Sequence, residues 1–160
     1  MKKLGLILLL FLILCSCKKS LKDKIIAKFE EKCKGDSVCI IDLKELTDFK
    51  WDKFYLVDLG VDPDKALGFR YPYWEDMATR IIFTLGNRVT YHEDEFPDLD
   101  NKYDGGLAFD IRTNNTSYWS CSSKNAVFTI KKIIYDDLIY YKISPIKQDT
   151  VGEITRFKYR

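Results

Sequence analysis

The amino-acid sequence predicts an α+β fold, in which an N-terminal helix packs on a mainly antiparallel β-sheet. One amphipathic helical segment comes first, and short β-rich runs follow it without long helices between them, which favours antiparallel pairing. Residues 80–85 and 88–92 are two such runs separated only by Gly86-Asn87, the pattern of a tight hairpin. A chain of 160 residues suits one domain with a short appendage, and we expect no second domain.

The expected elements have recognisable start and stop signals. A helix is expected over residues 20–32, where Ser20 can act as the N-cap and Ile25 and Phe29 lie on the apolar face. Asp62 before Pro63 indicates a short helical turn, because proline is favoured at the first helical position. The predicted strands are residues 38–43, 53–58, 80–85, 88–92, 107–112, 117–121, 126–135 and 138–144.

Residues 1–16 carry the pattern of an export signal peptide. Lys2 and Lys3 form a short positive region, and an uninterrupted apolar run follows over residues 4–14. Because a bilayer core needs about 20 apolar residues, this run is too short for a membrane span and predicts a cleaved signal. Cleavage removes two of the 26 basic residues, so the exported chain has 24 basic residues and 24 acidic ones. We expect no binding to nucleic acid from such a neutral envelope protein.

The segment Leu14-Cys-Ser-Cys17 resembles the lipobox of bacterial lipoprotein precursors. The resemblance implies cleavage before Cys17, a diacylglyceryl thioether on its sulfur, and acylation of its new amine by a chain such as palmitate. An ordinary secretory peptide cleaved nearby is the alternative. We therefore expect a lipid-anchored protein of the bacterial cell envelope that contacts the membrane through the acyl chains on Cys17. Residues 17–24 are then a lipidated tether, and residues 25–160 form a single α+β domain.

Export divides the five cysteines by fate. One leaves with the signal peptide, and Cys17 carries the lipid. Cys33 and Cys39 flank a short loop, so we expect a disulfide between them in an oxidising envelope. Cys121 then remains as a buried thiol. No local motif supports its pairing with His92 as a catalytic dyad, and we expect no cysteine catalysis.

The densest acidic stretch lies at residues 92–104, which are also rich in turn-forming side chains. Its carboxylates do not fit the EF-hand spacing, because Lys102 occupies a ligand position and Tyr103 replaces the turn glycine. We predict a solvated loop over residues 94–106, with an irregular calcium site as the alternative. No metal ion and no cofactor are expected, since the sequence lacks the known phosphate-binding and hydrolase motifs.

The segment Phe49-Lys-Trp-Asp-Lys-Phe-Tyr55 resembles a Phe-x-Trp-Asp-x-hydrophobic-Tyr motif shared by small bacterial lipoproteins and secreted proteins. The resemblance extends over residues 38–133 and implies no particular chemistry. From the residues themselves, we expect Trp51 to anchor the core and Asp52 to accept backbone hydrogen bonds before a strand. A ligand platform formed by Trp51 and Tyr55 is the alternative. Alternation along the strand places consecutive side chains on opposite faces of the sheet.

Four aromatic residues are candidates for an interaction surface: Tyr71, Tyr73, Trp74 and Tyr118. Aromatic side chains rimmed by polar residues are enriched at binding hot spots, whereas the alternative is that these rings pack beneath the loops. The expected function is that of a non-catalytic, lipid-anchored envelope protein that binds another protein or a cell-surface component. The alternative functions are an immunity-type inhibitor of a toxin delivered to the periplasm and a small envelope hydrolase that uses acidic residues.

Overall fold

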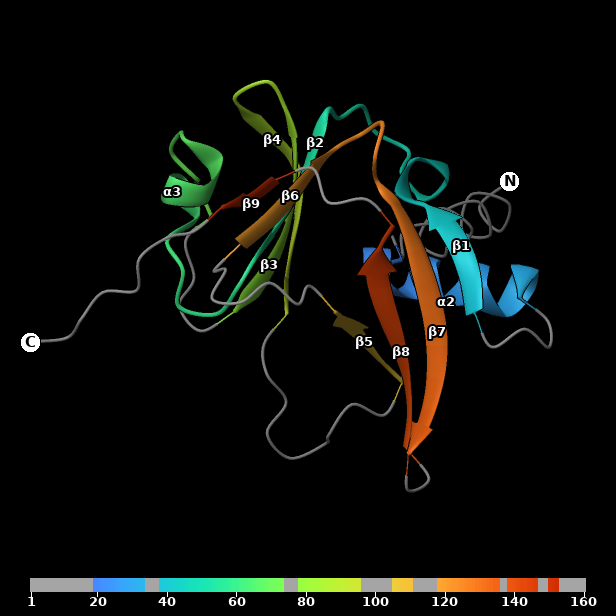
Figure 1. The fold of residues 1–160 in the computed structure, drawn as a ribbon. Helices are drawn as coiled ribbons and strands as arrows, with labels where there is room; N and C mark the ends of the chain where they lie inside the picture. The colour runs from blue at the N-terminus through green and yellow to red at the C-terminus, as the bar shows by residue number, and fades with distance from the viewer. Residues whose placement is uncertain are drawn as a thin grey trace, which may run out of the picture.

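A computed structural model describes residues 19–33, 38–73, 78–95, 105–110, 118–135, 138–146 and 150–152 (Figure 1). Its helical elements are α2 (Leu21–Lys32), η1 (a 3-10 turn, Leu43–Leu46) and α3 (Pro63–Leu67). Its strands are β1 (Val38–Asp42), β2 (Lys53–Val57), β3 (Thr79–Leu85), β4 (Arg88–Glu95), β5 (Gly106–Phe109), β6 (Tyr118–Ser122), β7 (Val127–Tyr135), β8 (Leu138–Pro145) and β9 (Thr150–Gly152).

The strands form two sheets. A four-stranded sheet has the order β1–β7–β8–β5, and a five-stranded sheet has the order β4–β3–β2–β6–β9. All pairs are antiparallel except the parallel pair of β5 with β8. The expected α+β class, a helix packed on one antiparallel sheet, is therefore wrong. The fold is mainly β and resembles a β-sandwich, with α2 as the one long helix of the described residues (Figure 1).

The physical reason for the second sheet lies in β2. Its residues Phe54, Tyr55, Leu56 and Val57 are all buried, with between 0% and 9% of each exposed. A strand that is apolar on both faces needs a cover on each side, which one sheet and one helix cannot provide. Phe54 and Leu56 pack into a cluster with α2 and the four-stranded sheet, whereas Tyr55 and Val57 pack against α3 on the other face.

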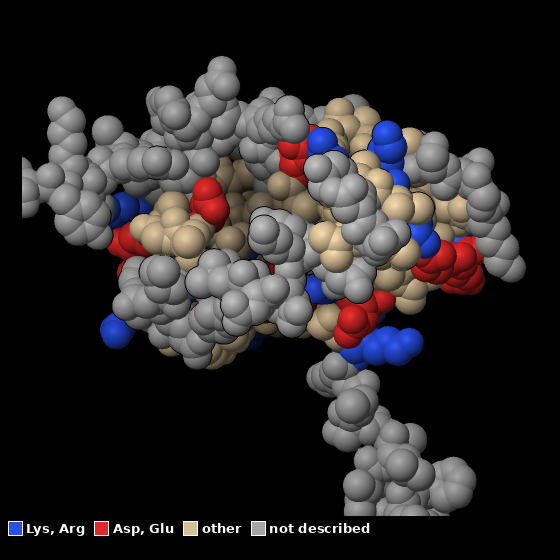
Figure 2. All heavy atoms as spheres, turned by 90° about the horizontal axis from the view of Figure 1, so that it is seen from below, with Lys and Arg blue, Asp and Glu red and all other residues tan. Residues whose placement is uncertain are grey.

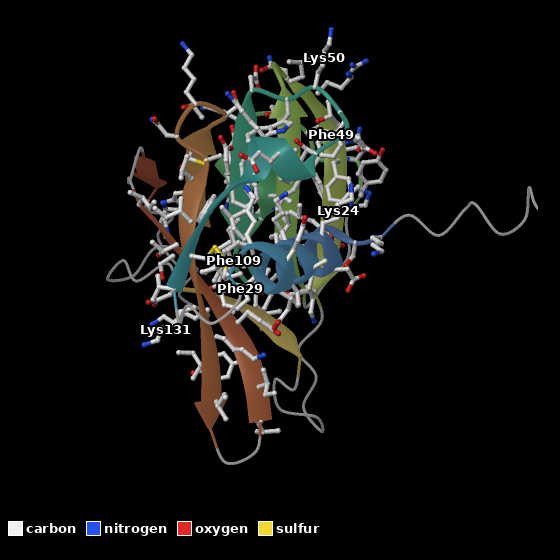
Figure 3. All side chains as sticks on the ribbon, turned by 90° about the vertical axis from the view of Figure 1, so that its right-hand side faces the viewer. Lys24, Phe29, Phe49, Lys50, Phe109 and Lys131 are labelled. Atoms are coloured by element: carbon white, nitrogen blue, oxygen red, sulfur yellow. A yellow bond between two sulfur atoms is a disulfide. The ribbon has the colours of Figure 1, made fainter. Side chains whose placement is uncertain are left out.

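The main core lies between the two sheets and α2. Phe54 is at its centre, with ring centroids 5.0 Å from Phe83, 5.9 Å from Trp119 and 6.0 Å from Phe128. Trp51 is also part of this core, and its indole nitrogen donates a hydrogen bond to the hydroxyl of Thr47 at 2.8 Å. The prediction that Trp51 anchors the core is thus confirmed. The helix contributes Leu21, Ile25 and Phe29, the last of which is labelled in Figure 3.

The start of α2 is held by β4. Ser20 caps the helix as predicted, and its side chain accepts a hydrogen bond from the backbone of the first turn. The backbone nitrogen of Leu21 donates to Oε2 of Glu93 at 2.9 Å and to the hydroxyl of Tyr91 at 3.3 Å. The carboxylate therefore meets the positive end of the helix dipole. Leu21 is buried, so the folded structure begins within residues 17–24, the stretch assigned to the tether.

The predicted hairpin is formed by β3 and β4. Gly86, in its two-residue turn, has a φ of 57°, a left-handed conformation that favours glycine. The backbone nitrogen of Gly86 donates to Oδ2 of Asp52 at 2.8 Å. Asp52 therefore accepts a backbone hydrogen bond as expected, and this bond ties the hairpin turn to the residue that precedes β2.

A β-bulge interrupts β4 just after this turn. Val89 and Tyr91 both have partners on β3, whereas Thr90 between them is an extra residue. In a regular strand, Val89 and His92 would face opposite sides of the sheet. The extra residue brings both to the side that α3 covers.

A second, smaller core lies on this outer face of the five-stranded sheet. It joins Tyr55, Val57 and Ile82 of the sheet to Ala66, Leu67 and Tyr71. The helix α3 has the predicted cap, since Asp62 accepts a hydrogen bond from the backbone nitrogen of Asp64 at 3.0 Å. Gly68 ends α3 in a left-handed conformation with a φ of 75°. The short helix therefore turns the chain back across the sheet, which places residues 71–73 over its outer face.

Charged side chains of both signs are mixed on the surface of the described residues. Figure 2 shows acidic and basic groups interspersed on the face seen from below. Ion pairs join separate elements, such as Lys32 with Glu45 at 2.7 Å and Lys142 with Asp110 at 2.6 Å. Exposed pairs of this kind each contribute between about 0 and 1 kcal/mol, so the cores carry most of the stability.

Candidate interaction site

Three of the four aromatic candidates lie near the outer face of the five-stranded sheet. Tyr71 is 4% exposed and belongs to the second core, whereas Tyr73 is 48% exposed. Tyr118, at the start of β6, is partly buried against the same core. Trp74 lies outside the described residues, as does the lipid-attachment candidate Cys17. The alternative that these rings pack inside therefore holds for Tyr71, whereas Tyr73 reaches the surface and its part in an interaction stays a prediction.

Tyr73 stacks on His92, a residue of β4. Their ring centroids are 4.0 Å apart, and their planes are inclined by 12°. Nδ1 of His92 is buried and makes no hydrogen bond within the described structure. An unsatisfied buried nitrogen costs about 1–3 kcal/mol. Native structures contain few such groups, and a functional role is one of the explanations for them.

Tyr71 supports this stack from the inside. Its ring makes edge-to-face contacts with Tyr73, at a centroid distance of 5.8 Å, and with His92, at 6.1 Å. Its backbone nitrogen donates to Oδ1 of Asp64 in α3 at 2.6 Å. The exposed ring of Tyr73 is therefore held by contacts to a strand and to the segment that follows α3.

Beside the stack lies a buried ion pair. Nε of Arg80 is 3.6 Å from Oδ1 of Asp94, and their side chains are only 2% and 12% exposed. The two residues face each other across β3 and β4, next to the pair of Ile82 and His92. The guanidinium also donates to the backbone oxygen of Ala78 at 3.5 Å. A buried ion pair contributes little to stability against an apolar pair of the same volume, but breaking it is costly.

The sequence alone did not identify Arg80, His92 and Asp94 as members of one site. A regular hairpin with the two-residue turn Gly86-Asn87 would pair Arg80 with Glu93. The bulge at Thr90 shifts the register by one residue and brings Asp94 opposite Arg80 instead. The only signal in the sequence is a charged residue near the start of a strand whose other residues are apolar or threonine.

The acidic residues of β4 make contacts in two different places. Asp94 pairs with Arg80, whereas Glu93 and Glu95 lie at the start of α2, where Glu95 is 3.7 Å from Lys22. Burial raises the pKa of the Glu95 carboxyl above its ordinary value; the positive charge of Lys22 opposes the rise, and the negative charge of Glu93 adds to it. These two glutamates therefore have a structural role in holding the helix. The prediction of a loop that starts at residue 94 is wrong at this end, because Asp94 and Glu95 belong to β4 and pair with β3. Residues 96–104 of the predicted loop lie outside the described residues.

The disulfide expected between Cys33 and Cys39 is present. It joins the C-cap of α2 to β1, with the two Cα atoms 5.9 Å apart. Cys121 is buried in the main core, as expected. Because Cys121 and His92 face opposite sides of the five-stranded sheet, the structure does not bring them together as a catalytic pair.

The arrangement of Tyr73 and His92 suits binding through ring contacts and hydrogen bonds. Within the residues that the structure describes, no group of three or more His, Cys, Asp or Glu side chains could hold a metal ion. None of the helices formed by these residues is both long and apolar enough to cross a membrane. Comparison of the chain with models of protein families, with curated proteins and with solved structures gives no match. The resemblance to small bacterial lipoproteins therefore stays a prediction.

Proposed function

We propose that this chain is a lipid-anchored, non-catalytic protein of the bacterial cell envelope whose domain binds another protein or a surface component through Tyr73 and His92. The anchor rests on the signal pattern of residues 1–16 and on Cys17. The binding role rests on one observation, an exposed tyrosine ring stacked on a histidine beside a buried ion pair. Tyrosine is enriched at binding hot spots, because it offers a large contact area at a low entropic cost.

Rigid support is what separates Tyr73 from an ordinary exposed aromatic residue. Its neighbours Tyr71 and His92 are both partly or fully buried, so the ring does not have to be ordered when a partner arrives. Ordering a side chain on binding costs about 0.5–1.5 kcal/mol, and a ring that is already held avoids much of this cost. The lipid anchor would keep this surface at the membrane, where envelope partners are concentrated.

Photo-crosslinking in living cells tests the proposed site. A photoreactive phenylalanine analogue replaces Tyr73 in the full chain, which is expressed in its own envelope and illuminated. We expect a discrete adduct with one partner. In the same cells, His92→Ala should lower the adduct yield about tenfold, because the ring at position 73 loses its stacking support, a loss of about 1.4 kcal/mol in binding.

The matched control carries the analogue at Ile134, which is 69% exposed and lies in the four-stranded sheet. That variant should give none of the adduct seen at position 73. Equal adducts from both positions, or none from position 73, would contradict the proposed site.

A further inference from the structure

The outer edge of the four-stranded sheet is formed by β1. It is the terminal strand of this sheet, and among the described residues no strand pairs with its other side. Figure 3 looks onto this edge, with β1 in front of β7 and α2 to one side. Val38 and Ile40 are 49% and 61% exposed on the face turned away from the main core. Edge strands are usually protected by lysine, proline or a bulge, and the strand from Val38 to Asp42 contains none of these.

The backbone of β1 has hydrogen-bonding groups that point away from the sheet. The backbone nitrogen of Leu43 donates to the oxygen of Ala126, the residue before β7, at 3.0 Å. In an antiparallel pair these bonds recur at every second residue, so Cys39 and Ile41 bond toward β7 as well. The N–H and C=O groups of the alternate residues, Val38, Ile40 and Asp42, consequently point outward along the edge.

This edge is also held in place before any partner arrives. The disulfide of Cys39 ties β1 to the end of α2, and Ile41 is only 2% exposed in the main core. The side chain of Asp42 accepts a hydrogen bond from the backbone nitrogen of Lys44 at 2.9 Å. A pre-ordered strand can accept another strand with little loss of entropy, as in β-strand addition.

We propose that β1 pairs with β1 of a second copy of this chain, in an antiparallel dimer centred on Ile40. In this register Ile40 faces Ile40 of the second copy, and Val38 faces Asp42. All three outward-pointing residues of each copy then make backbone hydrogen bonds. The two four-stranded sheets become one continuous sheet of eight strands. The interface is isologous, because the same residues contribute from both copies.

Side-chain chemistry favours this register. The two exposed isoleucine side chains cover each other, and no like charges lie opposite one another. The exposed Lys131 of β7 is paired with Val38 of β1. In the dimer, Val38 faces Asp42 of the second copy, so Lys131 and that Asp42 lie in one row across the strands, two strand spacings or about 10 Å apart. Figure 3 shows Lys131 pointing outward from the sheet. Each copy therefore places a basic residue in the row of the other copy's acidic residue.

Register-specific cysteine crosslinking of the full chain in bacterial membranes tests this dimer. Cα atoms in a hydrogen-bonded antiparallel pair are about 5.5 Å apart, within the range that a disulfide spans. Ile40→Cys should therefore give a covalent dimer under mild oxidation. Val38→Cys alone should give none, since two Val38 positions are offset by four residues, or about 13 Å. Co-expression of two single variants, Val38→Cys and Asp42→Cys, should restore the crosslink between the two chains.

Two controls keep the result interpretable. Ile134→Cys, at an exposed site far along β7, measures random collision and should crosslink at least tenfold less than Ile40→Cys. Peptide mapping must show the Cys33–Cys39 disulfide intact in every variant. As a cysteine-independent arm, Ile40→Lys should abolish the dimer that an amine-reactive crosslinker traps in the unmodified chain, whereas Ile134→Lys should leave it.

The proposal is overturned if Ile40→Cys gives no dimer, or if Val38→Cys and Ile134→Cys crosslink as readily. An adduct of a mass other than twice that of the chain also overturns it, because another polypeptide would then occupy the edge. The dimer does not depend on the proposed partner site, since Tyr73 lies on the outer face of the other sheet.

Discussion

Individual side chains at the candidate site are arranged at some cost to stability. Arg80 is 1% exposed and is paired with Asp94, although apolar residues in these places could stabilise the fold as well. Nδ1 of His92 is buried without a hydrogen bond in the described structure. Both features lie beside the one exposed ring of the cluster, Tyr73. Part of this cost therefore falls where a partner is proposed to bind, and the indole nitrogen of Trp119 in the main core is likewise buried without a hydrogen bond in the described structure.

The buried carboxyl of Glu95 predicts how the stability of the fold changes with pH. Because burial raises its pKa, the native state binds this proton more tightly than the unfolded chain does. The stability contributed by Glu95 should therefore fall as the pH rises from its ordinary pKa through the raised one. We expect the stability of Glu95→Gln, relative to the unmodified chain, to increase as the pH rises above the ordinary glutamate pKa of about 4.3. Urea unfolding at a series of pH values measures this difference.

The control for this measurement is Glu31→Gln on the exposed side of α2. The side chain of Glu31 is 72% exposed, so the same substitution there should change stability little across this range. A stability difference for Glu95→Gln that does not vary with pH would show that burial of the carboxyl has no such effect.

The strands β4 and β1 each contain a local feature that affects a longer stretch of chain, a bulge in β4 and a disulfide in β1. The bulge at Thr90 turns His92 toward α3, and without it the same strand would present other side chains to the candidate site. The Cys33–Cys39 disulfide links α2 to β1, although these elements also contact each other through buried residues. The bulge therefore determines which side chains β4 presents, whereas the disulfide adds to contacts that already hold α2 against β1.

Removal of the disulfide should therefore be measurable. Replacing both Cys33 and Cys39 by alanine should lower the free energy of unfolding by about 2 kcal/mol, the value for closing so short a loop in the unfolded chain. Urea unfolding followed by circular dichroism provides the measurement. The unmodified chain under a reducing agent should match the double variant, and the double variant should not respond to the reducing agent. Equal stability of the oxidised chain and the double variant would contradict the expectation.

The whole molecule is organised around β2. Its two buried faces belong to two cores, so the five-stranded sheet is covered by α2 and the four-stranded sheet on one side and by α3 on the other. The described chain starts next to β4, where Leu21 is held by Tyr91 and Glu93. Only three residues separate Cys17 from Leu21. Four Cα–Cα steps reach at most about 14 Å, so a lipid on Cys17 would hold this end of the domain within about that distance of the membrane surface.

Two single substitutions, at neighbouring cysteines, test the lipid anchor. Cys17→Ser should abolish metabolic labelling with palmitate and leave the signal peptide uncleaved, because the modified thiol is required for processing. Cys15→Ser should be labelled and processed like the unmodified chain. Labelling in cells followed by membrane fractionation measures both. Processing and membrane attachment of Cys17→Ser would show that the ordinary secretory peptide is the correct alternative.

Most of the separate elements could be predicted from the sequence. The cap at Ser20, the turn at Gly86 and the proline at position 63 act within a few residues, so the sequence around each of them is sufficient. The short strand β9 was missed, since three residues carry too little pattern to be recognised and its pairing with β6 is a tertiary contact. The site was predicted in part: Tyr71, Tyr73 and Tyr118 were named, but not the residues of β3 and β4 beside them.

By itself, the sequence determined where the helices and most strands lie and which cysteines pair. Only the tertiary structure decided that the strands divide into two sheets, that β5 pairs in parallel with β8, and that Arg80 meets Asp94. The physical reason is the sequence distance over which each kind of interaction acts. Caps, turns and alternation are local, whereas the choice of a pairing partner depends on how apolar faces distant in the chain can all be buried at once, and a single extra residue such as Thr90 shifts the outcome.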